Sequence, residues 1–187
     1  MLPSHRSIAA LRFTKGMDID RLLLEIAAVL SDDGLTIGGL VQVSTDNQVQ
    51  RSASVYVVDL LSGDRFNIWE PRGHWAKGCR LDENGLAAAE AAVLRSIEAK
   101  PDLVLLNRFG RAETKGRGLI NCFAKAMAEG VPVLTAVRDP FDLPWSEFHA
   151  GMATALPPSV AAATSWVRGL GASARISTAE AVPNPDC

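Results

Sequence analysis

The residues that suggest a binding site lie in one short stretch, Asn107 to Gly118. It holds three arginines, one lysine, one glutamate and three glycines, directly after an apolar run from Leu103 to Leu106. Arginine presents a planar fork of donors that suits a carboxylate, a phosphate or another tetrahedral oxyanion. We therefore expect an anion-binding loop; a solvated loop with surface ion pairs is the alternative. The expected ligand-binding residues here are Asn107, Arg108, Gly110, Lys115 and Arg117.

The same loop contains one acidic residue, Glu113. A carboxylate beside several cations is a candidate general base, although it could equally pair with Lys115 or with an arginine. Glu113 is the catalytic candidate of this sequence, and the catalytic residues are otherwise undetermined.

A second candidate segment is Thr14-Lys15-Gly16, between an apolar run and an amphipathic stretch that starts near Asp18. A phosphate-binding loop needs the spacing G-x-x-x-x-G-K-[ST], which this segment lacks. A turn that leads into a helix N-terminus can still bind an anion through its backbone N–H groups. A tight turn without a ligand is the alternative.

Two further sites add candidates. Cys79 precedes Arg80, and cationic neighbours favour its thiolate, whereas a buried and inert thiol is the more common situation. His74 and Cys79 are too few ligands for a zinc site, so we expect no metal. Arg138 follows an apolar run, and we include it among the ligand-binding residues.

The segment after Arg138 also holds acidic, aromatic and histidine side chains. A catalytic interpretation is open, but we favour a Pro-rich lid or connection in which Trp145 and Phe148 pack inward. The residues that suggest catalysis are Asp139, Asp142, Trp145, Glu147 and His149.

The elements that must position these residues alternate between strands and helices. This order predicts an α/β fold of three layers, with a mostly parallel sheet and one inserted β-hairpin around Ser62-Gly63-Asp64. The predicted strands are 7–13, 35–43, 54–60, 65–69, 103–106 and 131–137. One predicted helix starts near Asp18, and three more cover 83–99, 118–129 and 160–168.

In such sheets, ligands bind beyond the carboxyl ends of the strands. The turn at Lys15-Gly16 and the loop from Asn107 to Gly118 both leave strands at that edge. We therefore expect the two segments to face each other and to bind one anion together.

Length and composition limit the broad class. The 187 residues fit one α/β domain, 1–168, followed by a flexible C-terminal tail, 169–187. The net charge of −2 gives no support to general nucleic-acid binding. Three widely spaced cysteines favour a reducing compartment, no apolar run could span a membrane, and we expect a cytoplasmic location.

Several of these segments resemble an uncharacterised bacterial family, domain of unknown function 2478. The matching strings are GGLVQ at 38–42, GCRLD at 78–82, DLVLLNRFGRAETKGRG at 102–118, GVPVLTAV at 130–137 and the W-x-x-F of Trp145 and Phe148. Members are often encoded beside molybdate transport or nitrogen-fixation genes, so the resemblance implies an oxyanion or metal-cofactor context.

The layout is also remotely similar to thermophile-type P-loop nucleoside triphosphatases, with two departures. The phosphate loop has shrunk to Thr14-Lys15-Gly16, and Asn107-Arg108 stand where that family has an acidic pair. Both changes remove groups that hold Mg²⁺-nucleotide.

Three functional hypotheses follow. We favour a domain that binds a small anion (phosphate, nucleotide or a molybdate-like oxyanion) without turnover. The alternatives are a nucleotide hydrolase or transferase with divergent catalytic loops, and a regulatory module that uses the charged loop to contact a protein partner.

Overall fold

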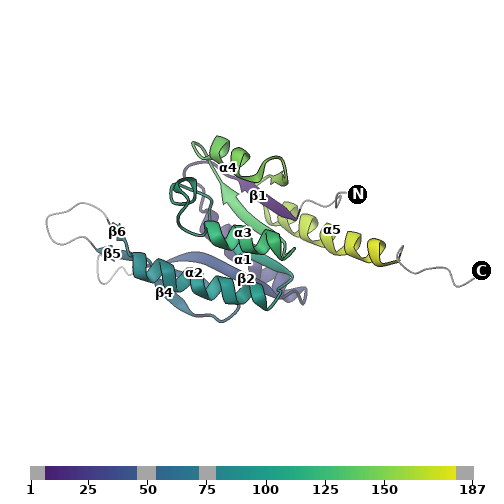
Figure 1. The fold of residues 1–187 in the computed structure, drawn as a ribbon, viewed down its shortest axis with the longest axis horizontal. Helices are drawn as coiled ribbons and strands as arrows, with labels where there is room; N and C mark the ends of the chain where they lie inside the picture. Colours follow the sequence, from purple (N-terminus) through teal and green to yellow (C-terminus); the bar gives the residue numbers. More distant parts are fainter. Residues whose placement is uncertain (1–6, 46–53, 72–78, 180–187) are drawn as a thin grey trace, which may run out of the picture.

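A seven-stranded sheet forms the middle layer of the molecule (Figure 1). The computed structural model describes residues 7–45, 54–71 and 79–179. The strands follow the order β4-β3-β2-β7-β8-β1-β9, in which β3 pairs antiparallel with both β2 and β4, and every other pair of neighbours is parallel. The strands are β1 (Ile8–Arg12), β2 (Ile37–Thr45), β3 (Ser54–Asp59), β4 (Arg65–Asn67), β7 (Leu103–Leu106), β8 (Val133–Val137) and β9 (Ala153–Leu156).

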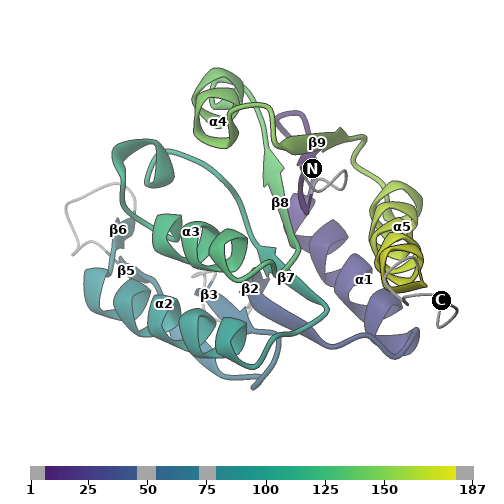
Figure 2. The same cartoon turned by 45° about the vertical axis from the view of Figure 1, so that its right-hand side comes forward.

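Helices cover both faces of this sheet (Figure 2). Helices α1 (Ile19–Asp32) and α5 (Val160–Ala179) lie on one face, and their buried side chains form one apolar core with β1, β7 and β8. Helices α2 (Glu83–Glu98), α3 (Ile120–Ala128) and α4 (Asp142–His149) contribute to the core on the opposite face. These three layers confirm the predicted α/β class, with its mostly parallel sheet and its inserted hairpin, β3–β4.

Helix α1 shows how the sequence specifies an element that borders the candidate site. Ile19, Leu23, Ile26 and Leu30 recur at helical spacing, and all four are buried against the sheet. Asp18 caps the helix, because its carboxylate accepts the N–H of Arg21 at 3.1 Å. The cap fixes the first turn of α1 at the carboxyl end of β1.

Strand β2 contains a glycine that the packing requires. Gly39 has φ +103, and a Cβ at this position would collide with the backbone of Leu105 in β7. The absence of a side chain lets β2 lie beside β7 in the register Gly39↔Leu105. This close approach brings the carboxyl ends of β2 and β7 together.

Two elements in the segment after β8 differ from the sequence-based expectation of a Pro-rich connection. Helix α4 forms there and tolerates Pro144, because this proline lies in its first turn, where a missing N–H costs no helical hydrogen bond. Strand β9 then pairs with β1 as the edge of the sheet.

The expectations at two other places also need changes. Strands β5 (Trp69–Pro71) and β6 (Cys79–Leu81) pair in a segment that, beyond residue 69, lies outside the predicted strands. Helix α5 continues beyond Arg168 to Ala179, through a segment assigned to the tail, because alanines and serines outnumber its two glycines and no proline interrupts it. Residues 180–187 of the predicted tail lie outside the described residues, so the domain boundary stays a prediction.

Candidate functional site

The carboxyl ends of β1, β2, β7 and β8 meet at one edge of the sheet, as parallel strands must. The loop from Asn107 to Leu119 leaves β7 at this edge. Its start is fixed to the neighbouring strand, because the N–H of Phe109 donates to the carbonyl of Ala136 at 3.0 Å.

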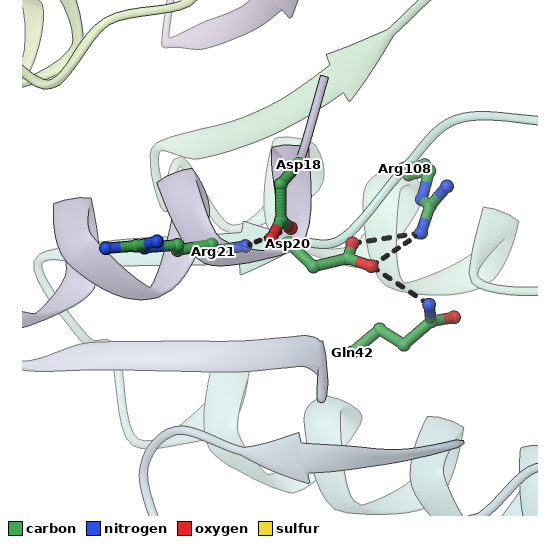
Figure 3. A network of polar contacts seen from close by, with 5 residues as sticks. All are labelled: Asp18, Asp20, Arg21, Gln42 and Arg108. Atoms are coloured by element: carbon green, nitrogen blue, oxygen red, sulfur yellow. Dashed lines mark hydrogen bonds and ion pairs between the residues drawn. The ribbon is translucent and has the colours of Figure 1, made fainter. Parts of the chain in front are cut away.

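Arg108 connects this loop to helix α1 (Figure 3). Its Nη2 donates to both carboxylate oxygens of Asp20, at 2.9 Å to Oδ1 and 2.8 Å to Oδ2. The amide Nε2 of Gln42, on β2, donates to Oδ2 of the same carboxylate at 2.9 Å. The side chains are 35% exposed for Arg108 and 19% exposed for Asp20, so this ion pair is partly shielded from water.

The first turn of α1 therefore carries its own anions. Asp18 accepts a backbone N–H as the cap, and Asp20 adds a second carboxylate two residues later. Negative charge here is stabilised by the partial positive charge of the helix N-terminus. The same interaction would attract a phosphate, so the two aspartates occupy the end of the helix that we expected to bind the ligand.

Glu113 organises the loop from the inside. Its Oε2 accepts the N–H of Gly110 at 3.0 Å, and its Oε1 accepts the N–H of Leu119 at 3.1 Å. The carboxylate thus closes the loop at both ends and is not paired with Lys115. These two bonds give Glu113 a structural role, and the catalytic role considered for it remains a prediction without a contact to support it.

Gly118 makes this arrangement feasible. It has φ +69, and a Cβ added to it would collide with Oε1 of Glu113. Gly116, two residues earlier, also has positive φ, but a Cβ there would meet nothing within 4 Å. Gly118 therefore supplies both a left-handed backbone and the space for the inward carboxylate.

Because the loop's one carboxylate points inward, its outer face is cationic. Arg111, Lys115 and Arg117 are exposed, and none of the three pairs with a carboxylate in the part of the chain that the structure describes. This arrangement differs from the alternative of a loop whose charges cancel in surface ion pairs.

The turn before α1 is less closely associated with the loop than we expected. Thr14, Lys15 and Gly16 are exposed, with Gly16 at φ +96. Within the described residues, the polar link between the loop and the start of α1 runs to Asp20, and no hydrogen bond or ion pair joins the loop to Lys15 or Gly16. The structure thus brings Arg108 to the first turn of α1, although β7, the strand before the loop, lies two positions from β1 in the sheet.

The remaining predicted residues belong to different elements of the fold. Oδ1 of Asn107 is buried and accepts no hydrogen bond from the described residues. Arg138, half-buried at the end of β8, donates from Nη1 to the carbonyl of Asp139 at 3.2 Å. Cys79 and Arg80 belong to β6 in the separate two-stranded sheet, and their side chains lie outside the described part of the chain.

Two residues of the network were not identified from the sequence, Asp20 and Gln42. A polar signal existed for each: Asp20 is an acidic residue in the first turn of a helix, and Gln42 interrupts the apolar run of β2. Neither signal indicates the partner, because the contacts depend on the order of the strands.

An aromatic cluster anchors the start of the loop on the face of the sheet opposite to α1. The ring of Phe109 lies 5.0 Å from Trp145, 5.3 Å from Phe148 and 6.0 Å from Phe123, measured between centroids. Trp145 is 2% exposed, and Phe148 packs against the core. The expectation that these two side chains of α4 pack inward is confirmed.

Two polar residues of this region have structural contacts. Nη2 of Arg12 lies 2.9 Å from Oδ1 of Asp142, an ion-pair distance without hydrogen-bond alignment. Nδ1 of His149 accepts the N–H groups of Gly151 and Ala153 at 3.0 and 3.3 Å. These contacts fit the interpretation of α4 as a packed connection.

The described cysteine side chain is that of Cys122 on α3. It is free and buried, and burial, with a smaller effect of the Glu90 charge, raises the pKa of its thiol to about 12. It therefore stays protonated near neutral pH, and a buried protonated thiol is a poor nucleophile and a poor metal ligand.

Residues 7–45, 54–71 and 79–179 contain no group of three or more His, Cys, Asp or Glu residues placed to hold a metal ion. They also contain no helix with the length and apolar character needed to cross a membrane.

Comparisons with known proteins agree with the resemblance that the sequence motifs indicate. The family model described as "Protein of unknown function (DUF2478)" matches residues 8–166. The curated protein named Molybdenum import ATP-binding protein ModC 2, from Bradyrhizobium diazoefficiens, is 37% identical over 149 residues. The match covers 80% of this chain but 17% of that relative, so the chain corresponds to a small part of a much longer protein.

The fold has a solved counterpart as well. The solution structure of a human cancer-related nucleoside triphosphatase superposes with a TM-score of 0.66, over 88% of this chain and 97% of that one. The sequence identity is 15%, so the likeness concerns the fold alone. It confirms the predicted P-loop-NTPase-like architecture.

Proposed function

The chain belongs to the DUF2478 family, and we propose that it is an accessory domain that binds a small oxyanion or a nucleotide-like anion without turnover. The observation that carries this proposal is Arg108, held at the carboxyl edge of the sheet by a carboxylate whose two oxygens both accept from its Nη2. Its Nη1 and Nε donate to no group in the described residues. The guanidinium therefore has donors left for a ligand.

The surroundings of Arg108 support an anion more than a metal-bound nucleotide. Lys15 and the exposed cations of the loop lie in segments that leave the same edge. The sequence lacks the G-x-x-x-x-G-K-[ST] spacing that holds the β- and γ-phosphates, and Asn107 replaces the acidic residue that would hold Mg²⁺. The alternative of a nucleoside triphosphatase or transferase would need other groups for both tasks.

We further propose that the domain works beside molybdenum uptake or use. The relative from Bradyrhizobium is named for molybdenum import, and the shared segment amounts to 17% of its length. Molybdate is a tetrahedral dianion, which suits a guanidinium fork. A cytoplasmic location, as predicted from the cysteine content, would be consistent with this role.

The test is a melting-temperature screen of the purified chain against molybdate, tungstate, sulfate, phosphate, ADP and ATP. A ligand at one hundred times its Kd stabilises the fold by about 2.7 kcal/mol, which raises Tm by roughly 2–4 °C for a chain of this size. We expect at least one oxyanion to give such a shift.

Arg108→Ala should remove the shift, and Arg95→Ala should keep it. Arg95 is an exposed cation in the last turn of α2, and therefore controls for the loss of one positive charge away from the proposed site. A screen in which no anion moves Tm, or in which both variants behave alike, would overturn the proposal.

The cationic outer face of the loop favours a second candidate function, a module that contacts a protein partner. Arg111, Lys115 and Arg117 point outward on a loop closed by Glu113, an arrangement that suits an acidic surface. The triple alanine variant should then no longer co-purify with the partner, and high salt should release the partner from the wild type. Oxyanion binding at Arg108 should persist in the variant.

A further inference from the structure

We propose that Asp20 is an internal competitor for the anion site, so that a ligand binds by displacing its carboxylate from Arg108. This inference rests on the proposed function, because it assigns a controlling residue to the same site. In the structure, Nη2 of Arg108 already donates to Asp20, so a ligand has to replace this acceptor to bind there.

The geometry of the network supports displacement. Both oxygens of Asp20 contact the same nitrogen of Arg108, at 2.9 and 2.8 Å, in place of a two-nitrogen fork. A tetrahedral oxyanion that engaged Nη2 together with Nη1 or Nε would make the better-matched pair. The network is therefore a complete but weaker version of the contact that the ligand would make.

Asp20 is not held by Arg108 alone. Nε2 of Gln42 donates to Oδ2, and the carboxylate lies in the first turn of α1, whose partial positive charge stabilises it. A carboxylate released from Arg108 would keep these two interactions and remain near the site. Its charge would then repel a bound anion, and the repulsion would be larger for a dianion than for a monoanion.

Displacement also couples the ligand to the loop. Among the described residues, Arg108 makes the polar contact between the loop and α1, through Asp20. A ligand that takes over Arg108 exchanges this link for its own contacts. When a ligand is bound, the ion pair between Arg108 and Asp20 is therefore broken, and when that pair is intact, the ligand is absent.

The experiment compares tungstate and perrhenate, which share a tetrahedral shape and carry two and one negative charges. Calorimetric titrations use the wild type, Asp20→Asn, and Asp33→Asn as a matched control. Asp33, the residue that follows α1, also forms an ion pair, with Arg168 at 2.7 Å, but at the opposite end of the helix. A second variant, Asp20→Ser, serves if the asparagine variant does not keep the wild-type circular dichroism spectrum.

We expect Asp20→Asn to bind tungstate about tenfold more tightly, a change equivalent to about 1.4 kcal/mol. The substitution removes both the competing ion pair and the repulsion of the dianion by the released carboxylate. The gain for perrhenate should be smaller, because less repulsion is relieved. Asp33→Asn should bind both anions as the wild type does, and adding Arg108→Ala to Asp20→Asn should abolish the gain.

Each outcome separates the two proposals. If the wild type binds tungstate and Asp20→Asn binds it equally or more weakly, the competitor role is wrong and the proposed function stands. If only the Asp20 variants bind, the competitor role is supported and the wild-type chain is not a constitutive oxyanion binder. If neither the wild type nor the Asp20 variants bind, both proposals are overturned. If Asp33→Asn gains as much affinity for tungstate as Asp20→Asn does, the effect comes from net charge and the competitor role is wrong.

Discussion

Arg108 and Asp20 form an ion pair across 88 positions of the sequence, with Nη2 of the arginine 2.8 Å from Oδ2 of the aspartate. The pair joins the loop after β7 to the first turn of α1. It lies at the carboxyl edge of the sheet, where an α/β fold of this kind binds its ligands.

The strength of this pair follows from its partial exposure. Because water still reaches both side chains, we expect the pair to contribute less than about 1 kcal/mol to the free energy of unfolding. A double-mutant cycle with Asp20→Ala and Arg108→Ala, measured by urea unfolding, gives the coupling energy. A coupling above about 3 kcal/mol would mean that the pair behaves as a buried one.

Gly116 and Gly118 offer a matched pair of substitutions. Both have positive φ, so alanine at either position should cost roughly 1–2 kcal/mol in backbone strain. Alanine at Gly118 should cost about 1–3 kcal/mol more, because its Cβ would displace the carboxylate of Glu113. Chemical denaturation of both variants tests the difference.

The control repeats both glycine substitutions in the background of Glu113→Ala, which removes the collision with the carboxylate and leaves the close approach to the Cβ of Ala112. The two glycine substitutions should then differ by much less. Equal costs for both in the wild-type background would contradict the structural role given to Glu113.

Thiol chemistry distinguishes Cys122 from an accessible cysteine. With a pKa of about 12, its thiol should not react with Ellman's reagent in the native protein at pH 8. After denaturation under non-reducing conditions, all three thiols of the chain should react, because we predict no disulfide at Cys79. A count of one would show that two cysteines are bridged.

The same thiol adds a dependence of stability on high pH. Its pKa is raised in the folded state from an ordinary value of 9.0, so the unfolded chain loses this proton first as pH rises. Folding stability should therefore fall above pH 9, by up to about 1.4 kcal/mol per pH unit from this group. Urea unfolding of Cys122→Ala, which lacks the thiol, should show a smaller fall over the same range.

Nucleotide turnover should be absent. Without a phosphate loop and with Asn107 in place of an acidic residue, the chain lacks the groups that position Mg²⁺ and the γ-phosphate. We expect no Mg²⁺-dependent release of phosphate from ATP or GTP. Sustained turnover near 1 s⁻¹, roughly the lower range of typical enzymes, would contradict this if Lys15→Ala abolished it.

The sequence predicts the elements whose side chains repeat regularly. Leu23, Ile26 and Leu30 identify the buried face of α1, and the apolar run of β7 identifies a strand buried on both faces. Strand β9 has no such signal, because it is four residues long, alternates weakly and gains its hydrogen bonds from the distant β1.

The site is predictable to a lesser degree. Charge and glycine content locate the loop, and the mostly parallel sheet expected for the fold places it at the carboxyl edge. The partner of Arg108 does not follow, because it depends on the arrangement of β2, β7, β8 and β1 in space. Likewise, nothing in the sequence around Glu113 distinguishes an inward carboxylate from one paired with Lys115.

The contact between Phe109 and Trp145 has an optical consequence. An indole 5.0 Å from the ring that starts the loop will change its emission when that ring moves. A displacement of Arg108, the preceding residue, should therefore be visible in unlabelled protein as a change in tryptophan fluorescence. The chain has four tryptophans, and Trp145→Phe isolates the signal that comes from this one.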